Sequence, residues 1–341
     1  MTGKGGKVRI GVFGTGAISQ LMHLPMLSER PDVELAAVCD PDELKARSVA
    51  ERFGIPQVLA DEAMVAARDI DGVVVAAPSF LHEVIAAQCL ERGKDVLVER
   101  PLALSPGGAR WLVDAAQDAG RSLVLGMAHR YQSDVMALRR AVADGALGTI
   151  GAVRVTWLNC AKRRPRSGWR RRALESGGGV LIDIGVPALD LALWVLGYPG
   201  VERVSALTLG DEVDDVEEDL HLHACAEGGV AISLSASWRF HGPDDQHRIE
   251  VFGSRGTAVM APLSIHRDEG GRTVDATPRL PQPSGGESMF TSGYRRLLDR
   301  FVAIVAGRAE AEPPTEQVAL MRLVEAAYRS AQEGREVTVS A

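Results

Sequence analysis

The first third of the chain alternates short apolar runs with segments in which apolar residues recur at helical spacing. Runs that are apolar at nearly every position are typical of buried parallel strands, because helices cover both faces of a parallel sheet. The predicted strands are Val8–Phe13, Val33–Cys39, Gly72–Ala77, Asp95–Val98 and Leu123–Leu125. Strands that alternate with helices in this way predict an α/β fold with a doubly wound parallel sheet.

The segments between these runs carry residues that start and stop helices. Asp42–Phe53 has helical spacing and is followed by Gly54, while Ser105 and Pro106 open a second helical segment. Serine accepts hydrogen bonds from the first N–H groups of a helix, and proline fits its first turn. We therefore expect helices at both places.

The rest of the chain has a different pattern, in which strand-like runs follow one another with few helices between them. The predicted strands are Gly151–Asn159, Val201–Leu209, Asp219–Ala226, Val230–Trp238, Arg248–Phe252 and Thr257–Met260. Val186–Leu196 is expected to be a helix that ends at Gly197, and Arg267–Glu287 a long surface loop. A series of strands after a βαβ block predicts a second α/β domain with a large open, mainly antiparallel sheet.

Length and composition agree with two ordinary domains. The 341 residues are enough for two hydrophobic cores, and 46% of them are hydrophobic and 24% charged. We therefore expect one domain over residues 1–127 and a second over residues 128–341. The last helix of the second domain could pack back on the first.

The charge balance excludes several classes of partner. A formal net charge of −7 gives no electrostatic reason to expect binding to nucleic acid or to a membrane. No apolar stretch approaches the ~18 residues of a membrane span, and Met1–Lys7 is too polar for a signal peptide. We expect a cytoplasmic protein. The four cysteines have no CxxC spacing, so neither a zinc site nor a disulfide framework is expected.

A glycine-rich turn follows the first predicted strand. It reads Gly14-Thr15-Gly16-Ala17-Ile18-Ser19, close to the dinucleotide-binding pattern of a Rossmann domain, in which the backbone approaches a pyrophosphate at a helix N-terminus. The third position of that pattern is Ser19 rather than Gly or Ala, and glycine-rich turns also occur for packing reasons. We expect contacts to the cofactor from Gly14, Gly16, Ala17 and Ile18.

Asp40 ends the second predicted strand, where a carboxylate can bind the ribose diol of an adenosine. An acidic group there repels the 2′-phosphate of NADP, so this position favours NAD. The alternative is that Asp40 only caps the turn that continues with Pro41.

Several further motifs follow one another along the chain. Glu99-Arg100-Pro101 comes after the apolar run Val96–Val98, and Pro78 and His82 precede it. Later motifs are Gly126–Tyr131, Trp169-Arg170, the glycine-rich stretch Gly177–Gly185 and Asp190. Together they resemble the motifs of the Gfo/Idh/MocA family (glucose–fructose oxidoreductase, inositol dehydrogenase, rhizopine catabolism) over most of the chain.

The resemblance implies a Rossmann domain, a substrate-binding and oligomerisation domain, a nicotinamide cofactor and a sugar, cyclitol or related substrate. It places Pro78, His82 and Glu99 beside the cofactor. The resemblance also implies that three residues contact the substrate, namely Arg130, Trp169 and Asp190.

Two residues depart from the family pattern. Arg100 stands where the family usually has lysine, and Pro187 stands where it usually has a histidine acid/base. Arginine can hold an oxygen or an anion in a two-pronged hydrogen bond, but its pKa above ~12 prevents it from releasing a proton. Proline carries no proton to transfer. Both changes remove a titratable group from the expected reaction.

Asp183 and Tyr131 are the candidates to handle the proton in their place, beside Arg100 as the third predicted catalytic residue. Asp183 could accept a proton, or could only bind the preceding glycine loop. Tyr131 has a phenol with a pKa near ~10, or could serve only as a packing aromatic between the domains. We expect no metal site, because His221 and His223 share a strand face without a suitable third ligand.

A basic run stands out in this acidic chain. It consists of Lys162, Arg163, Arg164, Arg166, Arg170, Arg171 and Arg172. It could clamp a carboxylate or a nucleotide-diphosphate sugar. It could instead be a solvated loop, or could contact an acidic segment such as Asp211–Asp219 of a neighbouring subunit.

These patterns leave two functions open. The first is a nicotinamide-dependent oxidoreductase that acts on a hydroxyl or keto group of a sugar, cyclitol or related small molecule, which could carry an anionic group. The alternative is a redox-silent member that binds a ligand or catalyses a non-redox rearrangement. In either case an open sheet face would need covering, so a homodimer or homotetramer is expected.

Overall fold

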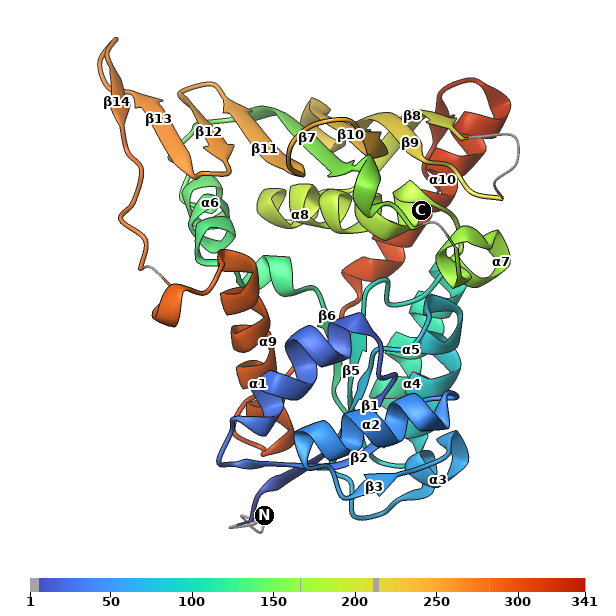
Figure 1. Cartoon of the computed structure of the whole chain (residues 1–341). Coiled ribbons are helices and arrows are strands. Elements are labelled where there is room, and N and C mark those ends of the chain that lie inside the picture. The colour runs from blue at the N-terminus through green and yellow to red at the C-terminus, as the bar shows by residue number, and fades with distance from the viewer. Residues whose placement is uncertain (1–5, 166, 211–214, 282, 341) are drawn as a thin grey trace. The chain divides into compact units, whose positions relative to one another are not determined.

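The computed structural model describes residues 6–165, 167–210, 215–281 and 283–340. The contacts divide the chain into two compact units (Figure 1). Unit 1 consists of Met1–Ala128 and Phe290–Gln317, and unit 2 consists of His129–Met289 and Val318–Ala341. The chain therefore passes from one unit to the other after residues 128, 289 and 317. The separation into domains over 1–127 and 128–341 stays a prediction.

Unit 1 is built on a parallel sheet whose strand order is β3-β2-β1-β4-β5-β6. Its strands are β1 (Val8–Phe13), β2 (Val33–Cys39), β3 (Gln57–Val58), β4 (Gly72–Val75), β5 (Asp95–Glu99) and β6 (Leu123–Gly126). Its helices are α1 (Leu24–Ser28), α2 (Glu43–Phe53), α3 (Asp61–Ala66), α4 (His82–Glu91), α5 (Pro106–Ala119) and α9 (Met289–Val305). Because the sheet extends in both directions from β1, right-handed crossovers place helices on both faces. The predicted doubly wound sheet is confirmed.

Helix α9 belongs to unit 1 although it lies far along the chain. Phe301 and Val305 lie against Gly72 at the start of β4, where an added Cβ would come within 2.9 Å of the Val305 side chain. Just beyond the helix, Arg308 forms an ion pair with Asp32 at 2.7 Å. The core of unit 1 therefore combines residues from two distant parts of the sequence.

Unit 2 is built on a mixed sheet with the order β14-β13-β12-β11-β7-β10-β9-β8-β15. Its strands are β7 (Ile150–Cys160), β8 (Val201–Leu209), β9 (Asp219–Ala226), β10 (Val230–Phe240), β11 (Gln246–Gly253), β12 (Gly256–Met260), β13 (Ser264–Asp268), β14 (Thr273–Asp275) and β15 (Val337–Thr338). Among the described strands β7 and β10 pair in parallel, and the other neighbours are antiparallel. The predicted open, mainly antiparallel sheet is confirmed.

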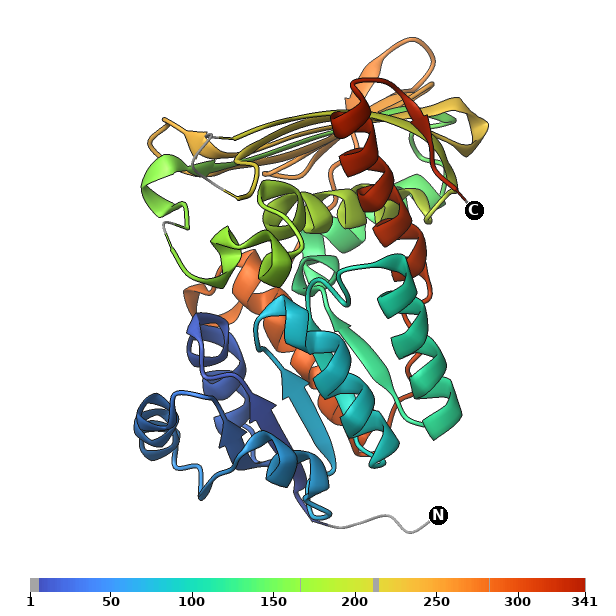
Figure 2. The ribbon, with the colours of Figure 1, turned by 90° about the vertical axis from the view of Figure 1, so that its right-hand side faces the viewer.

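The helices of unit 2 are α6 (Ser133–Ala143), α7 (Ala173–Ser176), α8 (Val186–Leu196) and most of α10 (Glu316–Glu333). Figure 2 shows the sheet nearly edge-on, with α8 and α10 against the same face. Along β10, Ile232, Leu234 and Ala236 are buried, while Ser233 and Ser235 between them are partly exposed. This alternation separates a face that packs on helices from a face of small and polar residues.

Two expectations need correction. No apolar stretch long enough to cross a membrane was expected, but the segment Ala173–Leu196 is long and apolar enough by composition. Of its most apolar 18 residues, 83% are buried inside the structure. That burial is typical of a core helix. The predicted loop Arg267–Glu287 is also partly wrong, because it contains the end of β13 and all of β14, which pair with each other. Exposed strands of this length leave little hydrophobic alternation in the sequence.

Candidate active site

The two glycines of the glycine-rich turn, Gly14 and Gly16, lack side chains for different reasons. Gly14 has φ of 88°, and a Cβ there would lie 2.5 Å from the carbonyl oxygen of Ala76. Gly14 is therefore required by the fold itself. A Cβ on Gly16 would meet no described atom within 4 Å. Packing does not explain the second glycine, whereas the close approach of a pyrophosphate does. The turn thus fits the expected cofactor.

The residue that departs from the glycine pattern, Ser19, is accommodated locally. It is fully buried, and its hydroxyl donates to the carbonyl oxygen of Gly14 at 2.6 Å. It opens a π-helical turn, η1 (Ser19–His23), that leads into α1. Gln20 donates to the carbonyl oxygen of Thr15 at 2.9 Å. These two bonds hold the turn against the first helical residues.

Asp40 at the end of β2 is held by the same turn. Its Oδ2 accepts from the backbone N–H and hydroxyl of Thr15, both at 2.8 Å, and lies 2.9 Å from Nζ of Lys45. Burial alone would raise the pKa of Asp40, but the bonds from Thr15 and Lys45 outweigh it and lower the pKa. Asp40 is therefore ionised where the ribose is expected. Sequence reasoning missed Lys45, whose only signal is its place in the first turn of α2.

His82 joins two loops at the ends of β4 and β5. Its Nδ1 lies 2.8 Å from the carbonyl oxygen of Pro101, and its Nε2 lies 2.9 Å from that of Ala77, next to Pro78. Burial lowers the pKa of His82 although both carbonyls favour its charged form. Because both ring nitrogens face the backbone, the geometry assigns His82 to loop positioning. Direct contact of Pro78 and His82 with the cofactor stays a prediction.

Glu99, the last residue of β5, carries a buried carboxylate directly before Arg100. Its Oε1 lies 2.8 Å from Nε2 of His23 and accepts from the hydroxyl of Tyr294 at 3.1 Å. Its Oε2 accepts from the backbone N–H of Arg100 at 3.3 Å. Sequence reasoning missed both partners. His23 is a polar residue in an apolar helical stretch, which is a weak signal, and Tyr294 lies 195 residues from Glu99.

In unit 2, the predicted substrate residues Arg130 and Asp190 bind each other. Asp190 is fully buried, and Arg130 donates to both of its oxygens, with Nε at 2.7 Å from Oδ2. Tyr198 donates to the same carboxylate at 2.5 Å. These contacts around the buried Asp190 tie the turn η3 (Ala128–Tyr131) to α8. Contact of Arg130 or Asp190 with a substrate stays a prediction, and so does the catalytic role of Tyr131.

The second glycine-rich stretch is packed against protein. A Cβ on Gly178 would lie 1.8 Å from the hydroxyl of Tyr328, and one on Gly179 would lie 2.0 Å from the carbonyl oxygen of Glu217. The Glu217 carboxylate accepts from the N–H groups of Gly179 and Leu181 and from Tyr328, each at 2.9 Å. The N–H groups that could bind a phosphate therefore already bind a carboxylate of the chain.

Asp183 lies in the π-helical turn η6 (Leu181–Gly185) that follows this stretch. Its side chain is 20% exposed, and Nε of Arg170 lies 3.6 Å from its Oδ1. The Arg170 guanidinium stacks over the ring of Trp169 at 4.2 Å from the centroid. The structure thus brings three residues of the predicted motifs together, whereas Pro187 is buried in α8. Catalysis by Asp183 and substrate binding by Trp169 stay predictions.

The basic run is organised by carboxylates of the same unit. Glu218, whose side chain is fully buried, binds Arg164 at 3.0 Å and Arg171 at 2.7 Å. Arg163 pairs with Asp245 at 2.7 Å. Arg166 and residues 211–214 of the proposed acidic segment lie outside the described residues. These pairs within unit 2 differ from both the solvated loop and the contact with a neighbouring subunit that the sequence suggested.

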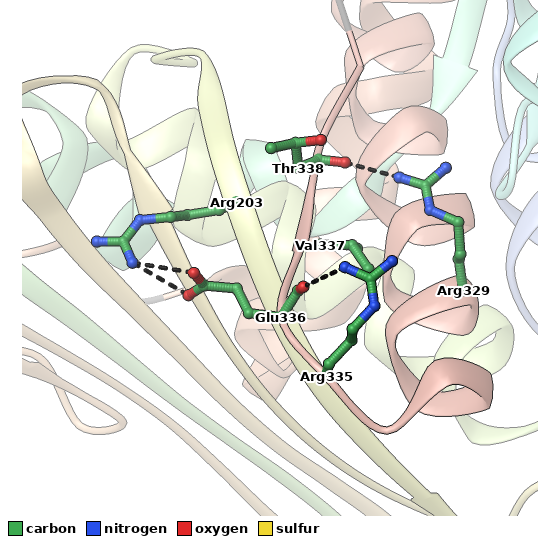
Figure 3. Close-up of a pocket in the computed structure, with 6 residues that line it drawn as sticks. All are labelled: Arg203, Arg329, Arg335, Glu336, Val337 and Thr338. Carbon is green, nitrogen blue, oxygen red and sulfur yellow. Dashed lines mark hydrogen bonds and ion pairs between the residues drawn. The ribbon is translucent and has the colours of Figure 1, made fainter.

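A surface pocket in unit 2 involves none of the predicted site residues. It has a volume of about 230 Å³ and is lined by Arg203, Arg329, Arg335, Glu336, Val337 and Thr338 (Figure 3). Arg203 binds Glu336 at 3.1 Å, and Arg329 donates to the carbonyl oxygen of Thr338 at 2.6 Å.

In the part of the chain that the structure describes, no group of three or more His, Cys, Asp or Glu could hold a metal ion.

Comparisons with known proteins agree with this geometry. Residues 8–127 match the Gfo/Idh/MocA oxidoreductase family with its NAD-binding Rossmann fold, and residues 135–259 match the C-terminal domain of that family. The putative UDP-kanosamine synthase oxidoreductase subunit of Amycolatopsis mediterranei (strain S699) is 32% identical over 96% of this chain and 97% of its own. D-glucoside 3-dehydrogenase of Escherichia coli (strain K12) is 29% identical over 97% of each chain.

Solved structures give the same result. GenD2 from gentamicin A biosynthesis, in complex with NAD, superposes with a TM-score of 0.83 at 31% identity and covers 98% of this chain and 97% of its own. Levoglucosan dehydrogenase in complex with NADH and levoglucosan superposes with a TM-score of 0.86 at 22% identity over 98% of this chain and all of its own, which supports the fold. The chain belongs to the Gfo/Idh/MocA family of NAD-binding oxidoreductases.

Proposed function

We propose that the protein transfers a hydride between NAD and a carbon that bears a hydroxyl or keto group in a sugar, cyclitol or related small molecule. One observation carries the proposal. Arg100 follows the carboxyl end of β5, and the glycine-rich turn follows the carboxyl end of β1, two strands away in the same sheet. Ligands of doubly wound sheets bind at this edge.

Arg100 would hold the reacting oxygen or a neighbouring anionic group of the substrate. Oxidation of an alcohol removes a hydride from carbon and a proton from oxygen, and NAD supplies the acceptor for the hydride. Because arginine does not release or accept the proton at ordinary pH, another group must handle it. We assign that role to Asp183 or Tyr131. Nε of Arg170 lies 3.6 Å from Oδ1 of Asp183 and so marks the side of this carboxylate that faces a cation.

The relatives support a polyhydroxylated ring as the substrate. Their names refer to a UDP-sugar, a glucoside and inositol. The test is to add NAD and a panel containing myo-inositol, methyl glucoside, D-glucose and UDP-glucose, and to follow the nicotinamide absorbance. Turnover that Arg100→Gln abolishes is the expected result. No absorbance change with any polyol, or with the corresponding keto-sugars and NADH, would contradict the proposal.

A redox-silent function is the second candidate, favoured by the joint presence of Arg100 and Pro187 at the two positions of the family's proton chemistry. Such a protein would bind an anionic ligand or guide a non-redox rearrangement. Product formation with a spectroscopically unchanged cofactor would establish it. A stoichiometric change in nicotinamide absorbance that accompanies product formation would eliminate the redox-silent function.

We further propose that the polar face of the unit 2 sheet binds a second copy of this chain in the cytoplasm, as a dimer or as half of a tetramer. The face carries Leu207 and Leu209, 55% and 50% exposed, and the ion pair of Arg154 with Glu250 at 3.5 Å. A face that carries exposed leucines and charges of both signs suits a self-complementary contact. Light scattering should show that Leu207→Lys has half the mass of the parent oligomer, whereas Leu174→Lys on α7 should keep the parent mass.

A further inference from the structure

His23, Glu99 and Tyr294 form a buried polar cluster directly before Arg100, which we call the Glu99 cluster. Its members come from three elements of unit 1: η1, β5 and α9. His23 and Tyr294 are 0% and 4% exposed, and only 9% of the Glu99 side chain is exposed. The rings of His23 and Tyr294 meet edge to face with their centroids 5.5 Å apart. The ring of Phe290 packs on that of Tyr294, with a centroid distance of 5.1 Å. The cluster is therefore fixed by packing as well as by hydrogen bonds.

Both oxygens of Glu99 are occupied. His23 and Tyr294 bind Oε1, while the backbone N–H of Arg100 binds Oε2. Burial would raise the pKa of Glu99, but the hydrogen bond and charge of His23, together with the charge of Arg100, lower it. An ionised carboxylate only accepts hydrogen bonds, so His23 Nε2 and the Tyr294 hydroxyl must donate.

The carboxylate also has little room to move. A Cβ on Gly126 at the end of β6 would lie 2.8 Å from Cα and 3.2 Å from Cδ of Glu99. The absence of a side chain at Gly126 therefore makes space for Glu99. Because the carboxylate is confined, its bond to the N–H of Arg100 fixes the backbone from which the Arg100 side chain extends.

The second nitrogen of His23 gives an independent argument. Nδ1 is buried and has no hydrogen-bond partner among the described residues. A buried polar atom without a partner destabilises the fold, so an apolar side chain would suit this position better on packing alone. The presence of histidine is explained by its other nitrogen, which donates to Glu99.

We infer that His23 and Tyr294 are positioning residues, which hold Glu99 and, through it, the backbone of Arg100. The inference rests on the proposed role of Arg100 at the reacting oxygen. It also links Arg100 to the cofactor turn, since His23 ends the helical turn that Ser19 anchors to Gly14. Displacement of a positioned group by a fraction of an ångström is enough to slow a reaction that depends on its orientation.

The test compares Glu99→Gln and Tyr294→Phe with Asp95→Asn. Asp95 is a matched control, because it begins the strand that Glu99 ends and its buried carboxylate also holds a backbone N–H, that of Ser122 at 2.8 Å. With the panel compound that turns over, Glu99→Gln should lower kcat about 10- to 100-fold, Tyr294→Phe less so, and Asp95→Asn not at all. The Kd of Tyr294→Phe for NADH should stay unchanged. His23→Gln, which keeps a donor, should retain more activity than His23→Leu.

A readout without turnover accompanies these rates. The NMR signal of the Arg100 Nε–H, assigned by its loss in Arg100→Lys, should shift in Tyr294→Phe and Glu99→Gln but not in Asp95→Asn. If kcat and this signal stay unchanged in both cluster variants, the inference is wrong. If the signal shifts but Arg100→Gln keeps full kcat, the cluster positions Arg100 while the proposed role of Arg100 fails. Tyr294→Phe, which only removes a hydroxyl, carries the test if Glu99→Gln does not fold.

Discussion

At the scale of single residues, the expected cofactor site depends on one carboxylate that serves two purposes. Asp40 binds the N–H and hydroxyl of Thr15, so it ties the end of β2 to the glycine turn. It also presents a negative charge where the ribose of NAD is expected. Lys45 lies 2.9 Å away and partly offsets that charge. We therefore expect the balance of these two side chains to set the selectivity between NAD and NADP.

Asp40→Ala should weaken NADH binding by about one to two powers of ten, because a hydrogen bond to a charged group contributes about 1.5–3 kcal/mol. NADPH binding should weaken less or improve, since the charge that repels its 2′-phosphate is gone. Calorimetric titration with both cofactors measures the ratio of the Kd for NADPH to the Kd for NADH. Asp42→Ala is the control: it removes the cap of α2 and should cost about 1 kcal/mol of stability without changing the ratio. Preference of the unaltered protein for NADPH would refute the assignment.

Arg100→Lys should retain or raise turnover, because a buried lysine can shift toward neutrality and exchange the proton that arginine keeps. Initial rates across pH provide the measurement, with Arg100→Gln as the variant that removes the charge. A Lys variant as inactive as the Gln variant would show that the two-pronged geometry of arginine is itself required.

At the scale of elements, the glycine loop before α8 shows how one segment is shaped by another. Gly178 and Gly179 lack side chains because Tyr328 and Glu217 occupy that space. The Glu217 carboxylate then satisfies two N–H groups at the start of the helical segment that carries Asp183. The position of Asp183 thus depends on residues far away in the sequence.

Gly179→Ala should destabilise the protein by about 1–3 kcal/mol, because its Cβ would collide with the backbone of Glu217. Urea unfolding measures the loss. Gly151→Ala on β7 is the control, since its Cβ would be 4.0 Å from the nearest atom, and it should stay within about 0.5 kcal/mol of the parent. Equal stability of the two variants would mean that the loop adjusts freely.

The sequence predicts elements better than contacts. β1, β2 and α8 have the predicted bounds, because buried strands and capped helices leave local patterns. The π-helical geometry of η1 before α1 leaves no such local pattern. His23, Lys45, Tyr198 and Tyr294 were missed because their roles arise from partners brought together by folding. The order of motifs indicated the family, whereas the pairing of Arg130 with Asp190 needed coordinates.

At the scale of the whole molecule, acid should destabilise the fold in two steps. Burial lowers the pKa of His82, so the unfolded chain binds its proton more readily and stability begins to fall below about pH 6.5. The lowered pKa values of Asp40 and Glu99 mean that their contribution is present above about pH 4 and is lost as pH falls further. Urea midpoints from pH 8 to 3 test this. A constant midpoint down to pH 5 would exclude the His82 step.

The discontinuity of unit 1 has a consequence for biosynthesis. Helix α9 supplies Phe301 and Val305 to the sheet of residues 8–126, yet it leaves the ribosome only after nearly all of unit 2 has been made. Domains usually fold in order as the chain emerges. Here the first sheet to be synthesised must wait, with part of its apolar surface uncovered, while the second is translated. The nascent chain should therefore be a chaperone client over this interval, and ribosome-stalled chains should become protease-resistant in unit 1 only once α9 has emerged.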